Sequence, residues 1–175
     1  SDFSMVKSLC NLYESFDKSE PSFDKEKLGE DYAQVAEKVF VFSIVWSIGA
    51  TINESGRKKF STNLAEIDPL GPAAGSMFDY FVDITKNDFA SWESKVPSWR
   101  PQKGMTFHDM IVPTVESTRS MYIVNTYMKN LHNVLLVGGT GTGKTILAQQ
   151  FLSDLPETHS QLTINFSAAT NSEQV

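Results

Sequence analysis

Gly138-Gly139-Thr140-Gly141-Thr142-Gly143-Lys144-Thr145 is the stretch that decides the fold. It fits G-x-x-x-x-G-K-[ST], the phosphate-loop (Walker A) pattern of nucleotide-binding proteins. An apolar run at residues 134–137 precedes it, and the apolar residues at 146, 147, 151 and 152 follow it at helical spacing. Strand, loop and helix therefore come in the order that the pattern requires. This context predicts a nucleotide-phosphate site at the start of an α/β core.

The residue types of this loop suit phosphate oxygens. Four glycines allow tight bends that turn successive N–H groups inward at a helix N-terminus, which carries roughly +0.5 charge. Lys144 would place its ammonium on the β- and γ-phosphates. The Thr145 hydroxyl would take one position on a Mg²⁺ ion that keeps several waters. All residues of the loop, 138–145, are therefore expected to bind the nucleotide.

Composition restricts the classes of protein that are possible. With 175 residues, 41% hydrophobic and 21% charged, the chain is long enough for one good core or two small ones. A net charge of −6 and a pI near 5.0 argue against a general nucleic-acid binder. Cys10 is the single cysteine, which excludes an internal disulfide and fits a cytosolic protein. The apolar run at residues 39–48 is too short to span a membrane, so a buried helix is expected.

The patterning predicts a helical part followed by an α/β part. Residues 17–31, which include Pro21, are expected to form a linker or loop, and the aromatic-rich residues 77–101 short strands or a hairpin. Thr114 with Ser117 three residues later favours a helix start. The further expected helices span residues 5–16, 32–52 and 57–67, and a second strand spans residues 162–166.

Several other residues are expected to be structural. The basic run at residues 57–59 is interpreted as a solvated face, and residues 77–79 as a structural segment, since a second acid is lacking. Arg119 could face nucleotide or a neighbouring module, with a helix-surface role as the alternative. The three tryptophans are expected to be packing anchors: Trp46, Trp92 and Trp99. The three histidines are scattered without metal-ligand spacing: His108, His132 and His159.

Several segments together resemble a dynein heavy chain, in the region joining its second and third AAA+ modules. Residues 39–49 resemble the apolar lid helix that closes the second module, and residues 77–80 with Trp99 resemble the connecting segment. Residues 112–119 resemble the start of the third module, with Glu116 and Ser117 where the family usually has Asp and Thr. Residues 165–170 resemble the strand and loop after the phosphate loop, with Ala169 for a usual Gln. Gly139 stands where the family commonly has Pro.

The resemblance implies a fold and an organisation. The fold is a helical AAA+ lid followed by the first part of a P-loop AAA+ α/β/α core with an incomplete parallel sheet. The implied divisions are a lid of the preceding module at residues 1–70, a connecting segment at 71–105 and the N-terminal part of the next module at 106–175. Because the flanking strands of such a core come later in sequence, residues 134–137 would have unpaired edges, and the isolated chain would be marginal or self-associating.

The resemblance also implies a function. The nucleotide would be ATP or ADP with Mg²⁺, and Ile111, Val112 and Pro113 would contact the adenine. The parent would be a microtubule motor, an AAA+ ATPase, whose partners are neighbouring AAA+ modules and dynein subunits. It would be cytoskeletal, with a lean towards the axoneme rather than the cytoplasmic form.

Hydrolysis is not expected of this chain alone. It needs an acidic metal ligand, a carboxylate that orients water and an arginine finger worth ~10³ to 10⁵ in rate. These would follow the phosphate loop, yet only thirty residues follow Thr145, and the chain starts without Met. We therefore expect an excised, inactive part of a longer protein in which nucleotide binding is regulatory.

Two other readings stay open at this stage. The chain could belong to another P-loop NTPase or kinase, although residues 85–88 are only a scrambled form of the Asn-Lys-x-Asp of GTPases. It could also be a structural interaction module whose loop binds nothing. Nucleotide titration separates these readings.

Overall fold

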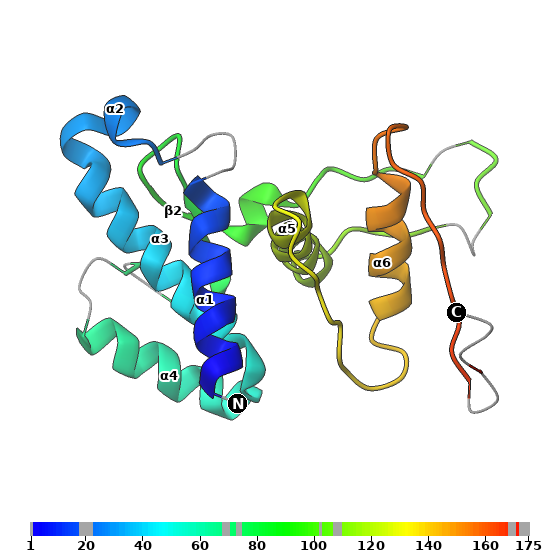
Figure 1. The fold of residues 1–175 in the computed structure, drawn as a ribbon, viewed down its shortest axis with the longest axis horizontal. Helices are drawn as coiled ribbons and strands as arrows, with labels where there is room; N and C mark the ends of the chain where they lie inside the picture. Colours follow the sequence, from blue (N-terminus) through cyan, green and yellow to red (C-terminus); the bar gives the residue numbers. More distant parts are fainter. Residues whose placement is uncertain are drawn as a thin grey trace. The chain divides into compact units, whose positions relative to one another are not determined.

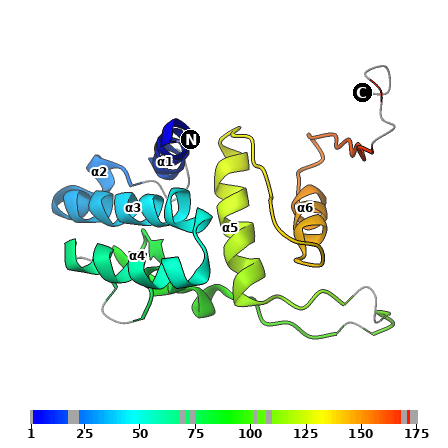
Figure 2. The same cartoon turned by 90° about the horizontal axis from the view of Figure 1, so that it is seen from below.

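A computed structural model of the chain describes residues 2–17, 23–67, 71–72, 75–101, 103–106, 110–167 and 171. The chain divides into two compact units, Ser1–Leu135 and Leu136–Val175, and each is described by itself. Figures 1 and 2 show the helices that build the first unit and the helix α6 of the second. Pro21, His108 and residues 168–170, which entered the sequence argument, lie outside the described residues.

Two helices form the centre of the first unit. Helix α1 (Asp2–Asp17) crosses α3 (Tyr32–Ser47), as Figure 2 shows most directly. Apolar side chains recur at helical spacing on both helices and meet in the core, where Leu12, Val35 and Val39 have no exposed surface. The predictions of helices at residues 5–16 and 32–52 are confirmed, although the second ends at Ser47 and a separate 3₁₀ turn, η2 (Gly49–Thr51), follows.

The segment between these helices differs in part from its prediction. Residues 25–31, expected to be a linker or loop, form the short helix α2 (Lys25–Leu28) and the 3₁₀ turn η1 (Gly29–Asp31). The Asp24 carboxylate starts α2 by accepting a hydrogen bond from the Glu26 N–H at 2.8 Å. A capped turn of this length carries no apolar periodicity, which is why the pattern did not predict it.

Helix α4 (Glu54–Ile67) begins three residues earlier than the predicted position 57. The Asn53 side chain accepts from the Gly56 N–H at 2.9 Å and so supplies the start signal. Gly49, in the preceding turn η2, lies against aromatic rings, because a Cβ there would meet Phe60 Cε1 and Phe78 Cζ at 2.9 Å each. A side chain at position 49 would therefore force the two rings apart.

The aromatic segment forms a hairpin, as predicted. Strands β1 (Tyr80–Asp83) and β2 (Asp88–Ser91) pair antiparallel with Phe81 opposite Ala90. The 3₁₀ turns η3 (Met77–Asp79) and η4 (Trp92–Lys95) flank them. Met77 and Phe78 are buried, and Asp79 closes a capping box with Ser76, so this segment is structural, as expected.

A buried lysine ties the hairpin to α3. Lys38 donates hydrogen bonds to the Asn87 main-chain oxygen at 3.0 Å and to the Asp88 carboxylate at 2.7 Å. The Asn87 side-chain amide donates to the Asp31 carboxylate at 2.9 Å. Polar contacts therefore fix the tight turn of the hairpin on the surface of the core.

Helix α5 (Val115–Lys129) completes the first unit. Its predicted start is confirmed, because Thr114 and Ser117 form a reciprocal capping box. Tyr122 lies among the rings of Phe42, Phe81 and Trp92, with Trp92 at 5.3 Å. Burial raises the pKa of Tyr122 to about 12.

The tryptophans behave largely as packing residues. Trp92 is completely buried, and Trp46 packs edge-to-face on Phe78 and Trp92 at 5.7 and 6.1 Å. Trp99 is half-buried in an irregular segment.

The second unit contains α6 (Lys144–Ser153), the predicted helix after the phosphate loop. The predictions of strands at residues 134–137 and 162–166 are wrong: neither segment pairs in a sheet within the described residues, where β1 and β2 form the sheet. Leu135 and Val137 are 86% and 83% exposed. The expected lack of neighbouring strands explains this, because a strand exists only where another strand takes up its N–H and C=O groups. The molecule is thus a helical unit with a two-stranded hairpin, followed by a unit in which α6 is the described helix. This arrangement is consistent with a helical lid followed by an incomplete α/β core.

One stretch of the described chain, Lys25–Thr51, is long and apolar enough to cross a membrane, since it contains an 18-residue window with a mean hydropathy of 1.3. It combines two helices and two 3₁₀ turns, and it carries Lys38 bound to the hairpin. Helix α3, which forms most of this stretch, supplies much of the protein core. The apolar composition of the stretch is therefore that expected of a helix buried in the core.

Candidate functional site

The phosphate loop joins the irregular segment at residues 134–137 to α6 through two left-handed glycines. Gly141 and Gly143 have φ of 75° and 78°, a conformation in which other residues are strained. Gly143 is the N-cap of α6 and has no side chain to bond the first amides of the helix. The first helical hydrogen bond runs from the Leu147 N–H to the Gly143 oxygen at 2.9 Å, so the amides of Lys144, Thr145 and Ile146 precede it.

Lys144 lies across this loop. Its ammonium donates to the Gly139 carbonyl and, at 3.1 Å, to the Thr142 hydroxyl, which itself donates to the Gly139 carbonyl at 2.9 Å. The loop is therefore closed over the cation by neutral oxygens. A phosphate oxygen is a stronger acceptor for an ammonium than either of these groups. The residues fit a phosphate, because an uncapped helix N-terminus and a lysine converge on the same short loop.

The first two glycines of the loop have different surroundings. A Cβ on Gly138 would lie 3.3 Å from the Thr142 hydroxyl oxygen, which is tighter than an ordinary contact. A Cβ on Gly139 would meet nothing within 4 Å. Position 139, where the sequence departs from the proline of the resembling family, thus has room for a side chain.

Thr145 is the residue that the sequence predicts as a metal ligand. Its side chain is exposed at the first turn of α6, where a hydroxyl is free to coordinate a hydrated Mg²⁺. Among the described residues no group of three or more His, Cys, Asp or Glu is placed to hold a metal.

The three residues expected at the adenine lie in the first unit. Ile111 and Val112 are 49% and 54% exposed, and Pro113 is half-buried. They directly precede Thr114, the cap of α5. These apolar side chains are therefore accessible to solvent. The phosphate loop belongs to the second unit, which is described separately.

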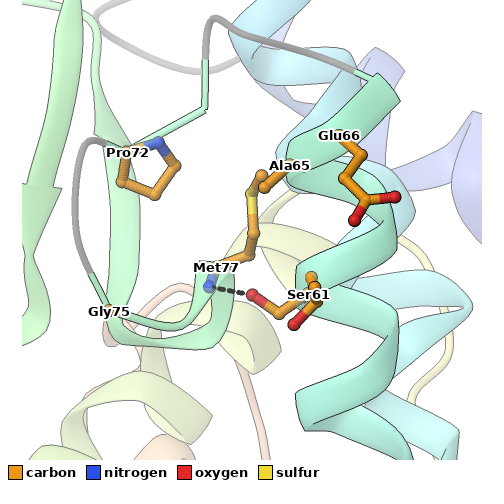
Figure 3. Close-up of a pocket in the computed structure, with 7 residues that line it drawn as sticks. Ser61, Ala65, Glu66, Pro72, Gly75 and Met77 are labelled. Atoms are coloured by element: carbon orange, nitrogen blue, oxygen red, sulfur yellow. Dashed lines mark hydrogen bonds between the residues drawn. The ribbon is translucent and has the colours of Figure 1, made fainter.

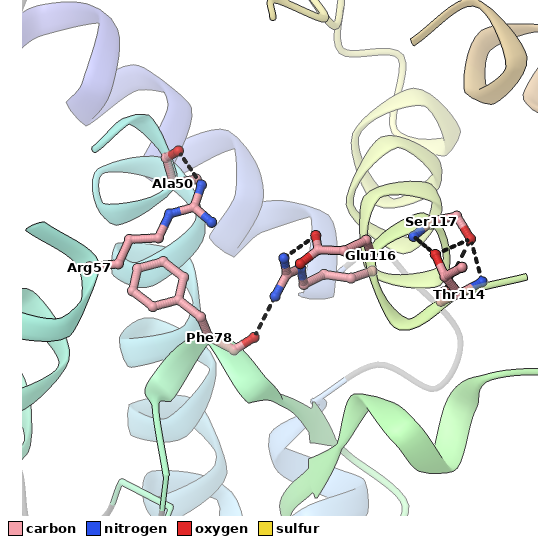
Figure 4. Close-up of polar contacts among 7 residues, drawn as sticks. Ala50, Arg57, Phe78, Thr114, Glu116 and Ser117 are labelled. Carbon is pink, nitrogen blue, oxygen red and sulfur yellow. Dashed lines mark hydrogen bonds and ion pairs between the residues drawn. The ribbon is translucent and has the colours of Figure 1, made fainter. Parts of the chain in front are cut away.

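Arg119 lies in the protein core, contrary to the expected helix-surface or nucleotide-facing roles. It is 7% exposed and donates to the Phe78 carbonyl at 3.2 Å (Figure 4). It also pairs with Glu116 on its own helix and lies over the Trp46 ring, 5.1 Å from its centroid. The sequence gives no signal for this, because the accepting carbonyl is 41 residues away and every residue has one.

Arg57 likewise departs from its predicted solvated face. Its Nη2 donates to the Ala50 carbonyl at 2.9 Å, and its guanidinium carbon lies 5.1 Å from the Phe78 ring centroid (Figure 4). Lys58 on the same run is exposed, as expected. Within this basic run, Arg57 therefore packs against an aromatic ring, whereas Lys58 is solvated.

A separate pocket lies beside α4, with a cavity volume of about 350 Å³. Figure 3 shows two of the residues that line it, Met77, whose N–H donates, and Ser61, whose hydroxyl accepts at 2.8 Å. Among the described lining residues Glu66 is the ionisable one, so the pocket offers no cation to a phosphate. The residues that line it are Ser61, Thr62, Ala65, Glu66, Pro72, Gly75 and Met77.

A helical unit followed by a glycine loop, a lysine and an uncapped helix defines a P-loop protein with a helical lid. Comparison with known protein families shows which family has this combination. Residues 1–94 match the family described as "Dynein heavy chain AAA lid domain", and residues 99–175 match "P-loop containing dynein motor region". The chain belongs to the dynein heavy chain family. The resemblance stated from the sequence is thereby confirmed.

Similar proteins include axonemal dyneins. The chain is 39% identical over 176 residues to dynein axonemal heavy chain 2 of Homo sapiens, covering 99% of this chain and 4% of that protein. It is 34% identical over 143 residues to the dynein-1-beta heavy chain of the flagellar inner arm I1 complex of Chlamydomonas reinhardtii, covering 81% of this chain and 3% of that protein. The chain thus spans about 4% of the length of the human relative.

Proposed function

We propose that this chain binds ATP or ADP with Mg²⁺ through Gly138 to Thr145, as a nucleotide-binding part of an axonemal dynein motor ring. The observation that carries the proposal is the convergence of Lys144 with the uncapped N-terminus of α6 on one glycine loop. Family membership supports the nucleotide and the metal. The names of the similar proteins support the axoneme as the location.

Each part of the loop has its own task in this proposal. The main-chain amides at the start of α6 bind phosphate oxygens and are helped by the helix dipole. Lys144 exchanges its contacts with Gly139 and Thr142 for the outer phosphates. Thr145 holds one position on Mg²⁺, which would neutralise phosphate charge when bound.

A regulatory role is proposed for this binding. Hydrolysis by P-loop proteins requires carboxylates beside the phosphates, whereas the residues of this loop supply binding groups alone. Occupancy by ATP or ADP would then modulate a motor that is powered at another module. Neighbouring AAA+ modules, dynein subunits and the microtubule are the proposed partners.

Two further points stay proposals that rest on the family pattern. Ile111, Val112 and Pro113 contact the adenine with apolar side chains. The functional divisions are the lid at residues 1–70, the connecting segment at 71–105 and the P-loop part at 106–175.

Titration of the purified chain with fluorescent ATP and GTP analogues, with and without Mg²⁺, tests the proposal. We expect ATP to bind more tightly with Mg²⁺ than without it, and Thr145→Ala to reduce that difference. Thr158→Ala, an exposed hydroxyl removed after α6, serves as the matched control. Tighter binding of GTP would favour another class of P-loop protein, and binding of neither nucleotide would favour a structural module.

A further inference from the structure

Lys144 and Thr142 share one hydrogen-bond acceptor inside the phosphate loop. The Lys144 ammonium donates to the Gly139 carbonyl and, at 3.1 Å, to the Thr142 hydroxyl oxygen. The Thr142 hydroxyl donates to the same carbonyl at 2.9 Å. These three groups are thus bonded pairwise, and the arrangement, which lies wholly within the second unit, is called the lysine latch below.

The latch folds the head of the lysine back onto the main chain of its own loop. A Cβ on Gly138 would lie 3.3 Å from the Thr142 hydroxyl oxygen, 3.8 Å from Lys144 Cδ and 3.9 Å from Lys144 Nζ. The end of the Lys144 side chain therefore lies close to Gly138, and Lys144 is half-buried whereas Thr142 is exposed. The ammonium is held against the loop rather than extended into solvent.

The number of N–H donors on Lys144 limits what the latch leaves for a ligand. An ammonium has three donors and no acceptor. The latch uses two of them, one on the Gly139 carbonyl and one on the Thr142 hydroxyl. A phosphate-loop lysine that reaches both the β- and the γ-phosphate needs two donors for the ligand. At least one latch contact must therefore open when a nucleoside triphosphate binds.

We infer that Thr142 is a positioning residue whose hydroxyl competes with phosphate for Lys144 and so lowers the affinity of the loop. The inference rests on the proposed function. The hydroxyl supplies the side-chain part of the latch, where its O–H donor and one lone pair are both engaged. A bond that holds Lys144 before binding and is broken on binding opposes the ligand. In this role the hydroxyl acts through Lys144 and not by touching a phosphate.

Two substitutions at position 142 separate this role from a general loosening of the loop. Thr142→Val keeps the branched shape of the side chain and removes the hydroxyl, whereas Thr142→Ser keeps the hydroxyl. A matched control lies in the same loop. Thr140 is also an exposed threonine, so Thr140→Val makes the same chemical change outside the latch.

The first measurement is the dissociation constant of Mg·ATP and of Mg·tripolyphosphate for the whole chain and its variants. Thr142→Val is expected to bind both ligands about threefold more tightly, near the lower end of the range for one hydrogen bond, because the hydroxyl is exposed to water. The factor should be the same for both ligands, since the latch opposes phosphates and not the base. Thr142→Ser and Thr140→Val should bind as the wild type does.

The second measurement tests the latch without a nucleotide. Acetic anhydride modifies lysine amines, and mass spectrometry of the digested chain gives the reaction rate at Lys144. The Lys58 side chain, 79% exposed on α4, is the internal reference. Because an amine held by two oxygens is less available to the reagent, the rate at Lys144 should rise about threefold in Thr142→Val and stay unchanged in Thr142→Ser.

The outcomes are distinguishable. Weaker binding by Thr142→Val, with recovery in Thr142→Ser, would mean that the hydroxyl binds the ligand, and it would overturn the competition. Unchanged binding by Thr142→Val, or an equal gain in Thr140→Val, would overturn it as well. An unchanged reaction rate at Lys144 in Thr142→Val would show that the hydroxyl does not hold the lysine. A wild-type chain that binds neither ligand would overturn the proposed function, and the competition with it.

Discussion

The guanidinium of Arg119 donates a hydrogen bond to the main-chain carbonyl of Phe78 at 3.2 Å, across 41 residues of sequence. This bond joins α5 to the turn before β1. The charge itself is paired with Glu116, whose side chain is 75% exposed. A buried cation with these partners should stabilise the first unit through its packing and its hydrogen bonds.

Replacing Arg119 should destabilise the fold more than replacing its acidic partner. We expect Arg119→Met to lower the free energy of unfolding by about 1.5–3 kcal/mol, because a buried hydrogen bond to a charged group is lost. Glu116→Gln should cost less than about 1 kcal/mol, since exposed ion pairs contribute little. Urea unfolding followed by tryptophan fluorescence measures both values. Equal losses in the two variants would mean that the ion pair, rather than the Phe78 carbonyl, holds the helix.

The contact between Lys38 and Asp88 should make stability depend on pH in the acid range. The hydrogen bond from Lys38 is the largest cause that holds the pKa of Asp88 below its ordinary value of 3.8. A lowered folded-state pKa contributes stability above the unfolded-state value, which is lost as pH falls through the folded-state pKa. Asp88→Asn should therefore be less stable at neutral pH and decline less steeply below about pH 4.

Urea unfolding at a series of pH values measures this dependence. Glu54→Gln removes a carboxylate that is 91% exposed and 4.0 Å from Lys58, and it serves as the control. An Asp88→Asn profile parallel to that of the wild type would show that the contact does not contribute.

Replacing Leu131 with glycine should increase the stability of the protein. It follows α5 with φ of 62° and is 90% exposed, although a left-handed residue costs roughly 1–2 kcal/mol unless it is glycine. After the flexibility of glycine is allowed for, Leu131→Gly should raise the free energy of unfolding by about 0.5–1 kcal/mol. Leu131→Ala keeps the strain and should bring no gain. Thermal melting compares the two, and a melting temperature lowered by glycine would contradict the strain.

The glycines of the phosphate loop should differ in their tolerance of a side chain. Gly143→Ala places a Cβ at φ of 78°, and the resulting strain should weaken Mg·ATP about tenfold. Gly139→Ala meets nothing within 4 Å and should bind as the wild type does. Calorimetric titration of both variants measures this. Equal weakening would mean that the loop adopts another conformation when nucleotide binds.

Local signals in the sequence were sufficient for the longer helices and for recognising the phosphate-loop pattern, although not for the short helix α2. Thr114 and Ser117 predicted the start of α5 because a capping box is a contact within one turn. The loop was recognisable because each of its residue types has a task at a fixed spacing. The hairpin followed from aromatic residues between turn signals.

Contacts between distant residues could not be predicted in the same way. Arg119 was not recognised as a core residue, because its partners are a main-chain carbonyl and the ring of Trp46, and neither leaves a pattern in the sequence. Residues 134–137 had the composition of a buried strand but not the neighbours that make one. Composition describes what a segment prefers, whereas pairing depends on the rest of the sheet.

The most direct test of nucleotide binding is isothermal titration of Mg·ATP into the wild-type chain and into Lys144→Ala and Lys58→Ala. Lys144 lies over the phosphate loop, whereas the Lys58 side chain is 79% exposed on α4. We expect saturable binding by the wild type and by Lys58→Ala, and a loss of at least about tenfold in affinity for Lys144→Ala. Equal affinities in all three proteins, or no binding by the wild type, would contradict the assignment of this loop as a nucleotide site.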